Sequence, residues 1–207
     1  MRPGLTLVRA IHCCSVGSGD GSGGTGGWDV IRIVRGDITT QEVDSIVNAA
    51  NEGLWAGGGV CGAIHAAAGP GLEVACRAIG RCPTGDAVIT LGFRLKARFV
   101  IHAVGPRWLG GDRGEAALLE RCYGSILRVA AENGIRSLAI PSISTGIFRF
   151  PLVEAAAIAM RVLQANDRED LDLRMVCFDR RTVAAYDWAW RGICAQSRDT
   201  GNRDLQA

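Results

Sequence analysis

No run of about 18 apolar residues occurs in this chain, so the sequence predicts no membrane-spanning helix. Lysine is nearly absent as well, because Lys96 is the only lysine among 23 basic residues. The 21 acidic residues reduce the net charge to +2, which gives the chain no overall attraction to nucleic acid or to an anionic membrane. We therefore expect no membrane partner, and we expect an anionic ligand to be held by local geometry.

Metal-binding and disulfide patterns are also missing. The sequence has three histidines and no Cys-x-x-Cys pair, so it predicts no metal site. Arg9 and His12 interrupt the apolar stretch near the N-terminus, which argues against a secretory signal. The eight cysteines are too sparse for a disulfide scaffold. We expect reduced, mostly buried thiols in a cytoplasmic protein: Cys13, Cys14, Cys61, Cys76, Cys82, Cys122, Cys177 and Cys194.

Glycine is in excess, at 28 of 207 residues. Residues 15–27 consist mostly of glycine and serine, a composition typical of a flexible linker. The sequence therefore predicts a flexible N-terminal segment at 1–27, one folded domain at 28–195 and a polar tail at 196–207.

Strand-like and helix-like patterns alternate along the domain, which indicates an α/β fold with helices on both faces of a largely parallel sheet. In such sheets a ligand binds beyond the carboxyl ends of the strands. We expect strands at 29–34, 45–48, 86–91, 98–104, 137–140 and 171–178, and helices at 60–68, 71–79, 115–133, 151–165 and 180–194.

Polar and small residues follow several of these strands. Asp37 comes after the first strand, either to cap the next turn or to bind a ligand. Asn48 and Asn51 follow the second strand, as turn formers or as ligand-binding amides. Small-residue stretches at 56–65 and 141–151 each lead into the start of a helix, where backbone N–H groups can approach a phosphate. Two such loops suggest a ligand with two phosphates, or with a phosphate linked to a sugar.

Neither of the common nucleotide motifs accounts for these loops. The Gly-Lys-Ser/Thr ending of a P-loop is absent, and so is a strand-Gly-x-Gly-x-x-Gly-helix unit with an acidic residue about twenty positions later. The sequence therefore indicates no bound nucleotide cofactor of either kind, and we expect no cofactor at all.

Five segments occur in a characteristic order and spacing: Gly-Asp-Ile-Thr at 36–39, Asn-Ala-Ala-Asn at 48–51, the glycine-rich stretch at 57–69, Ile-His-Ala-Val-Gly-Pro at 101–106 and Ser-Ile-Ser-Thr-Gly-Ile-Phe at 142–148. Together they resemble a macrodomain of the MacroD type over about residues 28–194. The resemblance implies a three-layer α/β/α fold with a mixed, mostly parallel six-stranded sheet. It also implies binding of ADP-ribose, and hydrolysis of mono-ADP-ribosyl esters on acidic side chains or of O-acetyl-ADP-ribose.

The same resemblance implies a role for individual residues. Asp37 matches the acceptor for the adenine amino group, with the Ile38 backbone beside it, and Asn51 matches the amide at the distal ribose. Phe178 is a candidate for stacking on adenine, or else an ordinary core aromatic. The remaining contacts implied are Gly58, Gly59 and the Cys61 backbone at the distal ribose and phosphates, Ser144, Thr145, Gly146 and Ile147 at the diphosphate, and Phe148 near the distal ribose. Asn48 and Val60 are further candidate ligand-binding residues.

Cys61 departs from the family pattern, which has an aspartate there that is described as activating water. An ordinary thiol is a weak general base near neutral pH. Three interpretations stay open: Cys61 is a bystander while the ligand phosphate orients water, Cys61 is chemically active, or the protein only binds. His65 lies one helical turn away, either as a partner for a Cys-His dyad or as a structural residue. His102 is expected to be hydrogen-bonded within a core strand.

The function expected from the sequence is ADP-ribose binding with hydrolysis of mono-ADP-ribosyl groups, with Asn51 and Cys61 as candidate catalytic residues. A non-catalytic ADP-ribose-binding module is the alternative, and a cysteine-dependent hydrolase of another substrate is the third possibility. The expected partner is ADP-ribose or an ADP-ribosylated protein, or nucleic acid only where its end is ADP-ribosylated. We expect a monomer.

Overall fold

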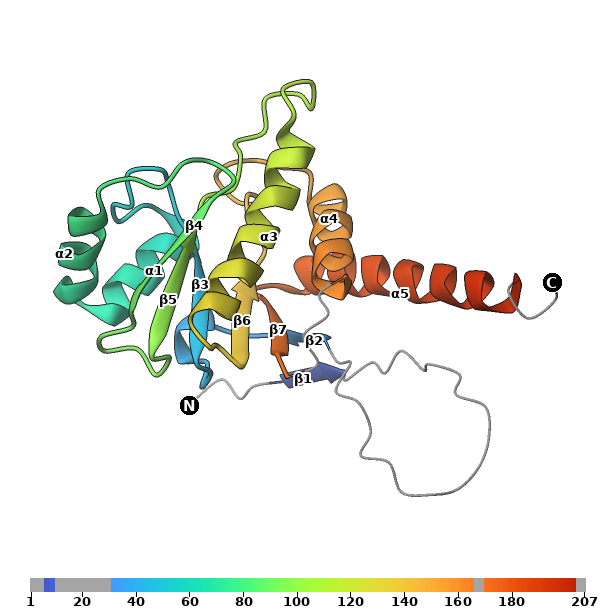
Figure 1. Cartoon of the computed structure of the whole chain (residues 1–207), viewed down its shortest axis with the longest axis horizontal. Helices are drawn as coiled ribbons and strands as arrows, with labels where there is room; N and C mark the ends of the chain where they lie inside the picture. Colours follow the sequence, from blue (N-terminus) through green and yellow to red (C-terminus); the bar gives the residue numbers. More distant parts are fainter. Residues whose placement is uncertain (1–5, 10–30, 166–169, 204–207) are drawn as a thin grey trace, which may run out of the picture.

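A seven-stranded sheet separates two helical layers (Figure 1). The computed structural model describes residues 6–9, 31–165 and 170–203. The strands are β1 (Thr6–Arg9), β2 (Ile31–Arg35), β3 (Ser45–Ala49), β4 (Ala87–Leu91), β5 (Phe99–Ala103), β6 (Ser137–Pro141) and β7 (Asp172–Cys177). The helices are the short 3₁₀ helix η1 (Ile38–Thr40), α1 (Gly59–Ala68), α2 (Pro70–Ile79), α3 (Glu115–Glu132), α4 (Leu152–Gln164) and α5 (Arg180–Arg203).

The strand order is β1-β2-β7-β6-β3-β5-β4. The five strands from β2 to β5 in this order are parallel, whereas β1 and β4 are antiparallel to their neighbours. The carboxyl ends of all five parallel strands therefore lie at one edge of the sheet, where ligands bind in this class of fold. The loops after β3 and β6 are neighbours at this edge because β3 and β6 are adjacent strands.

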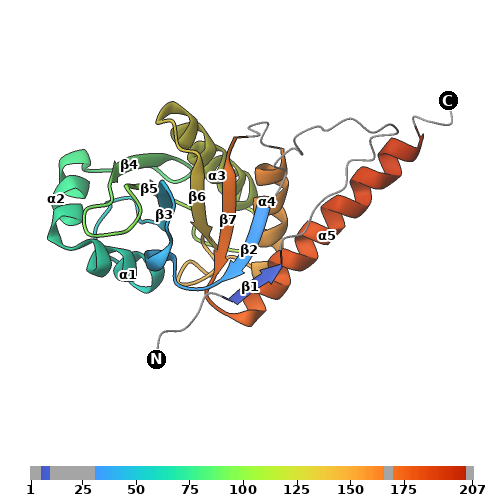
Figure 2. The same cartoon turned by 90° about the horizontal axis from the view of Figure 1, so that it is seen from below.

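Each face of the sheet has its own apolar core. On one face Leu119 and Tyr123 of α3 pack with Met160 of α4 and with buried side chains of α5. On the other face Ile64 of α1 and Leu72 of α2 pack beneath the sheet with residues of η1. Figure 2 shows α1 and α2 on one side of the strands and α4 and α5 on the other. The predicted α/β/α architecture with a mixed, mostly parallel sheet is confirmed, and β1 adds a seventh strand to the six that were expected.

The structure differs from the sequence prediction at both ends of the domain. Four residues of the segment expected to be flexible, Thr6–Arg9, form β1 and pair with the edge of β2. Their β-branched and apolar residues suit a strand that covers an otherwise open sheet edge. At the other end α5 continues to Arg203, into the expected tail at 196–207, because no proline interrupts it. The expected linker at 15–27 lies outside the described residues.

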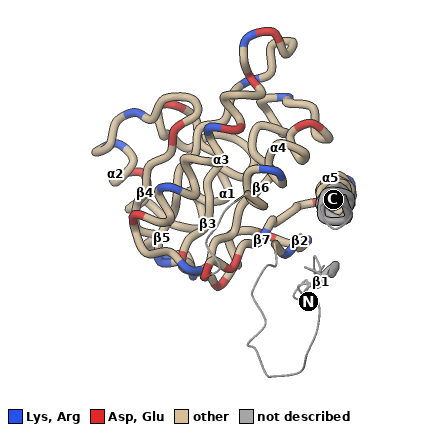
Figure 3. The backbone as a smooth tube through the Cα atoms, turned by 45° about the vertical axis from the view of Figure 1, so that its right-hand side comes forward, with Lys and Arg blue, Asp and Glu red and all other residues tan. Residues whose placement is uncertain are grey.

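The structure also bears on the expected thiols, on the charges and on membrane-spanning helices. Cys61, Cys76, Cys82, Cys122 and Cys177 are buried free thiols, as expected, whereas Cys13 and Cys14 lie outside the described residues. Basic and acidic positions are interspersed over the described chain (Figure 3). The helices that the structure describes are all too short or too polar to cross a bilayer.

Candidate functional site

The loop after β3 is held in shape by Asn51. Its side-chain nitrogen donates to the carbonyl oxygen of Trp55 at 2.8 Å, and its side-chain oxygen accepts from the Trp55 backbone N–H at 3.3 Å. The neighbouring Glu52 accepts from Arg81 and from the backbone N–H and hydroxyl of Thr84. These hydrogen bonds, first of all the one from Arg81, lower the pKa of Glu52 to about 2. The loop that carries Asn51 is therefore fixed to its surroundings before a ligand arrives.

This loop leads into the N-terminus of α1. Gly58 caps the helix without a side-chain hydrogen bond, and Gly59, Val60 and Cys61 form its first turn. A Cβ atom at Gly62 would lie 2.5 Å from the backbone oxygen of Gly57, so only glycine lets the loop approach the helix this closely. The first backbone N–H groups of a helix have no partner within it. They form a donor-rich, electropositive end that suits a phosphate.

The loop after β6 has a strained backbone and an unpaired buried oxygen. Ser144 has a φ of 65°, in the left-handed region that non-glycine residues rarely occupy. Its hydroxyl is buried and has no hydrogen-bond partner among the described residues. Thr145 Oγ1 lies within hydrogen-bond distance of both oxygens of Ser142, at 3.1 Å from the carbonyl and 2.8 Å from the hydroxyl. A Cβ atom at Gly105 would collide with Ser144 Oγ, so the segment after β5 also requires glycine here.

The two loops meet at the carboxyl edge of the sheet. A Cβ atom at Gly58 would lie 2.8 Å from Ile147 Cδ1, which places the second loop directly against the start of α1. Ile147 is nevertheless 64% exposed. A cation–π contact brings the Arg107 guanidinium carbon to 5.5 Å from the centre of the Phe148 ring. An adjoining open pocket of about 470 Å³ is lined by Arg107, Trp108, Leu109, Ile147, Phe148 and Arg149.

Asp37 and Phe178 lie at the ends of the adjacent strands β2 and β7. The backbone N–H of Gly36 donates to the Cys177 carbonyl at 3.0 Å, which joins the two segments. Asp37 caps η1, since its Oδ1 accepts from the Thr39 backbone N–H at 2.9 Å and from the Thr39 hydroxyl at 2.8 Å. Ile38, the first residue of η1, is buried. Phe178 is 88% exposed, so it is not an ordinary core aromatic.

Cys61 is nearly enclosed at the floor of this site. Only 4% of the residue is exposed, and its sulfur lies 3.7 Å from Asn48 Nδ2 and 3.7 Å from the Trp55 carbonyl oxygen. A Cβ atom at Gly57 would touch both Asn51 Nδ2 and Cys61 Sγ, at 3.5 and 3.8 Å. The described contacts of the sulfur do not include His65, so a Cys-His dyad is not formed.

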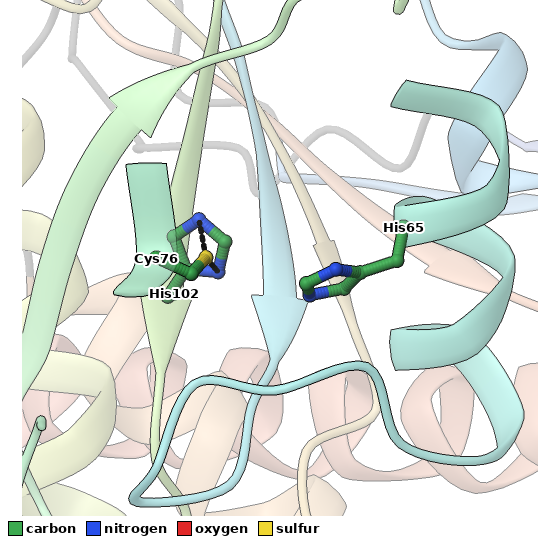
Figure 4. A group of neighbouring side chains, drawn as sticks. All are labelled: His65, Cys76 and His102. Atoms are coloured by element: carbon green, nitrogen blue, oxygen red, sulfur yellow. Dashed lines mark hydrogen bonds between the residues drawn. The ribbon is translucent and has the colours of Figure 1, made fainter. Parts of the chain in front are cut away.

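Behind Cys61 lies a buried group of three potential metal ligands, His65, Cys76 and His102, with one ligand atom of each within 4.8 Å of the others. Figure 4 shows Cys76 against the His102 ring and His65 on a separate helix. Cys76 Sγ is 3.7 Å from His102 Nε2 and 3.9 Å from Nδ1. If Cys76 and one nitrogen of His102 shared a metal ion, the sulfur would lie near that nitrogen and far from the other. The two distances are instead nearly equal, which is not the geometry of a shared metal ion.

The chemistry of this group also disfavours a metal. Both nitrogens of His102 already have hydrogen-bond partners, Thr90 and Asn48. Burial raises the pKa of the Cys76 thiol to about 11, so without a metal ion this side chain is a neutral thiol. As folded, these three side chains do not fit a metal ion. The prediction that His102 is hydrogen-bonded within a core strand is confirmed.

One residue that shapes the site, Glu115, was not singled out from the sequence. Glu115, at the start of α3, accepts from the backbone N–H groups of Leu109, Gly111 and Arg113 at 2.7–3.2 Å. Burial works to raise its pKa, and these N–H donors lower it below its usual value. Glu115 thereby fixes the loop that brings Arg107 to Phe148. The only signal for this in the sequence is the glycine-rich stretch at 110–114, directly before the helix.

A comparison with protein-family models matches residues 47–159 to the Macro domain. The chain belongs to the macro domain family. A macro domain-containing protein of Chlorobaculum tepidum is 51% identical over 163 residues, which are 77% of this chain and 95% of that protein. A protein of Enterobacter cloacae named O-acetyl-ADP-ribose deacetylase is 51% identical over 164 residues, covering 75% of this chain and 91% of its own length.

Solved macro domain structures agree with this assignment. The Oceanobacillus iheyensis macrodomain with ADP superimposes with a TM-score of 0.78 at 38% identity, over 82% of this chain and 94% of its own. The Trypanosoma brucei macrodomain in complex with ADP-ribose gives a TM-score of 0.69 at 40% identity, over 75% of this chain and 67% of its own. The macro domain fold of this chain is thus shared with structures that hold adenosine diphosphate groups.

Proposed function

We propose that this macro domain binds ADP-ribose at the carboxyl edge of the sheet and hydrolyses mono-ADP-ribosyl esters, including O-acetyl-ADP-ribose. One observation carries the binding proposal: two small-residue loops meet there, between the N-terminus of α1 and the unpaired hydroxyl of Ser144. Donor-rich backbone suits a diphosphate in a chain whose net charge is only +2. The similarity to proteins named O-acetyl-ADP-ribose deacetylase supports the hydrolytic step.

In this proposal the ligand extends from Asp37 towards Phe148. Adenine lies by Asp37 and the Ile38 backbone, with exposed Phe178 available to stack on it. The diphosphate lies between the start of α1 and the second loop, at Ser144, Thr145, Gly146 and Ile147. The distal ribose lies by Asn51, Gly58, Gly59 and Cys61, with Phe148 at its outer side. The adjoining pocket beside Arg107 leaves room for the acyl group or for the modified side chain.

The hydrolytic step adds water to the ester carbonyl and releases the ribose hydroxyl and a carboxylic acid. Cys61 supplies no fixed carboxylate to activate the water, so Asn51, the loop backbone and the ligand's own phosphate are the groups proposed to orient it. The enclosure of Cys61 and its contact with the Trp55 carbonyl support a bystander role for the thiol.

Calorimetry with ADP-ribose in the presence of EDTA tests the binding step. We expect a Kd in the micromolar range, equivalent to about −8 kcal/mol, and no loss on chelation. An absence of heat at millimolar ligand would overturn the whole proposal. Release of acetate from O-acetyl-ADP-ribose, and of ADP-ribose from a modified acidic side chain, tests the hydrolytic step, with Asn51→Ala compared with wild type.

A non-catalytic ADP-ribose-binding module is the second candidate. It is favoured by one observation: a cysteine stands where the family pattern has the aspartate that is described as activating water. Tight binding of ADP-ribose without turnover of either ester would select this candidate over the hydrolase. Turnover that is abolished by alkylation of Cys61 while ADP-ribose still binds would instead support cysteine-dependent chemistry.

A further inference from the structure

His102 lies on β5, between β3 and the edge strand β4, and is connected to the floor of the ligand site. It is fully buried in β5, and it pairs in register with Asn48 on the parallel strand β3. Side chains at paired positions lie on the same face of a sheet. Asn48, also fully buried, therefore stands between the His102 ring and the sulfur of Cys61, at 3.1 Å from the ring Nδ1 and 3.7 Å from Sγ.

The neighbours of His102 determine which ring nitrogen carries the hydrogen. Thr90 Oγ1 lies 3.1 Å from the Leu91 carbonyl oxygen, which can only accept, so we assign the single hydroxyl hydrogen of Thr90 to that carbonyl. The same hydroxyl oxygen lies 2.9 Å from His102 Nε2, and it is then available only as an acceptor. Burial, and secondarily the nearby His65, lower the pKa of His102 to about 4. With this assignment the one hydrogen of the neutral ring lies on Nε2, and Nδ1 is an acceptor.

An acceptor at Nδ1 fixes the orientation of the Asn48 amide. The amide must present its NH₂ group to the ring, and its second hydrogen then faces Cys61 Sγ. Asn48 Oδ1 points elsewhere, and it is buried without a hydrogen-bond partner among the described residues. Such an unpaired buried oxygen is unfavourable, so this orientation of the amide requires the acceptor at His102 Nδ1.

We propose that His102 is a positioning residue: through its contact with Thr90 it holds the Asn48 amide so that an N–H, and not the carbonyl, faces the Cys61 sulfur. An N–H donor beside sulfur favours the thiolate over the thiol. The opposite amide orientation would place an oxygen there and disfavour the thiolate. The proposal rests on the proposed function only in placing this thiol at the ADP-ribose site.

The other described groups around the ring do not fix which of its nitrogens carries the hydrogen. His65 from α1 has its ring centre 6.4 Å from that of His102, and Cys76 from α2 lies against the ring. Glu73 of α2 acts electrostatically on both His65 and Cys76. Within the described residues, Thr90 is the hydrogen-bond partner that distinguishes Nε2 from Nδ1.

Two variants of Thr90 test the proposal in the free protein. Thr90→Val keeps the shape of the side chain but removes the acceptor for Nε2–H, whereas Thr90→Ser keeps it. Nitrogen-15 NMR of histidine-labelled protein reports the protonated ring nitrogen directly. We expect Nε2–H at His102 in wild type and in Thr90→Ser, and a shift towards Nδ1–H in Thr90→Val. A proton on Nδ1 in the wild-type protein would overturn the proposal without any variant.

The second measurement is the pH dependence of Cys61 alkylation by iodoacetamide, with the labelled peptide identified by mass spectrometry. In Thr90→Val the midpoint should rise by about one pH unit, so that the rate below the midpoint falls about tenfold. Thr90→Ser should match wild type. Equal midpoints for Thr90→Val and Thr90→Ser would overturn the positioning role, because a merely structural defect does not shift this midpoint selectively.

Saturating ADP-ribose separates this proposal from the proposed function. If the ligand occupies the site, it should protect Cys61 from alkylation in the wild type and in both Thr90 variants. Loss of protection in all three proteins would contradict the proposed site, while the ring tautomer and the alkylation midpoint would still decide the role of His102.

Discussion

The neutral, buried His102 ring predicts a specific dependence of stability on pH. Its ordinary pKa of 6.5 falls to about 4 in the folded protein, chiefly because burial disfavours the charged ring. Between these two values the unfolded chain binds a proton at this position and the folded chain does not. Stability therefore rises with pH across this interval, so it is lost as the pH falls from about 6.5 towards 4.

The magnitude follows from the size of the shift. Each pKa unit corresponds to about 1.4 kcal/mol, so the contribution of His102 between about pH 7 and pH 5 is roughly 2 kcal/mol. Replacing His102 by glutamine removes the titrating group while retaining a side-chain donor for Thr90. We expect the free energy of unfolding of wild type to fall roughly 2 kcal/mol further than that of His102→Gln over this range.

Urea unfolding at a series of pH values provides the measurement, with the free energy extrapolated to water at each pH. Carboxylates such as Glu52 titrate in both proteins, so their contributions cancel in the difference between the two curves. The variant is expected to be less stable than wild type at pH 7. The test depends on how the free energy of unfolding of each protein changes with pH, and not on the difference between them at one pH. Parallel curves would mean that His102 is not held neutral, and the reasoning on its tautomer would fail with it.

Three further predictions concern the ligand site. Asp37→Ala should weaken the binding of ADP-ribose by roughly 1.5–3 kcal/mol, the value of a hydrogen bond to a charged group, and should leave the binding of ribose-5-phosphate unchanged in calorimetry. Equal weakening of both ligands would mean that Asp37 acts only as a cap for Thr39. Gly146→Glu should abolish ADP-ribose binding without changing the thermal melting temperature. The control Gly146→Ala should still bind, because its Cβ meets no atom within 4 Å. Retained binding by a folded Gly146→Glu protein would place the phosphates elsewhere. Cys61→Ala should keep most of the hydrolysis, and a loss above about a hundredfold at unchanged affinity would make Cys61 a general base or nucleophile.

The layers of the fold could be predicted because their signals are local. Leu119, Tyr123 and Ile126 recur at helical spacing and are buried on one face of α3. Pro151 directly precedes α4, which begins at Leu152. The strand β1 could not be found in this way, because only four residues form it and a long glycine-rich stretch separates them from β2. Its position depends on an available sheet edge, which is a tertiary property.

The candidate site was predictable where its residues follow strands, and less so where they act through other residues. Asn51 and the loop at 142–148 were identified from their sequence, and the structure brings their loops to one edge. The exposure of Phe178 excludes the core-aromatic alternative, whereas the capping of η1 by Asp37 is compatible with either of its two predicted roles. The bonds from Glu115 to the loop at 109–113 depend on a carboxylate folding back on the preceding backbone. A single glutamate at the start of a helix does not reveal this.

The contact between Asn48 and His102 illustrates the limit most clearly. The two residues are 54 positions apart, and a shift of β5 by one residue would turn His102 to the opposite face of the sheet. Only the register of three strands brings Thr90, His102 and Asn48 into one chain of hydrogen bonds ending at Cys61. The cysteine that departs from the family pattern is thus held by core residues, including the Ile-His-Ala-Val-Gly-Pro segment that matches the pattern.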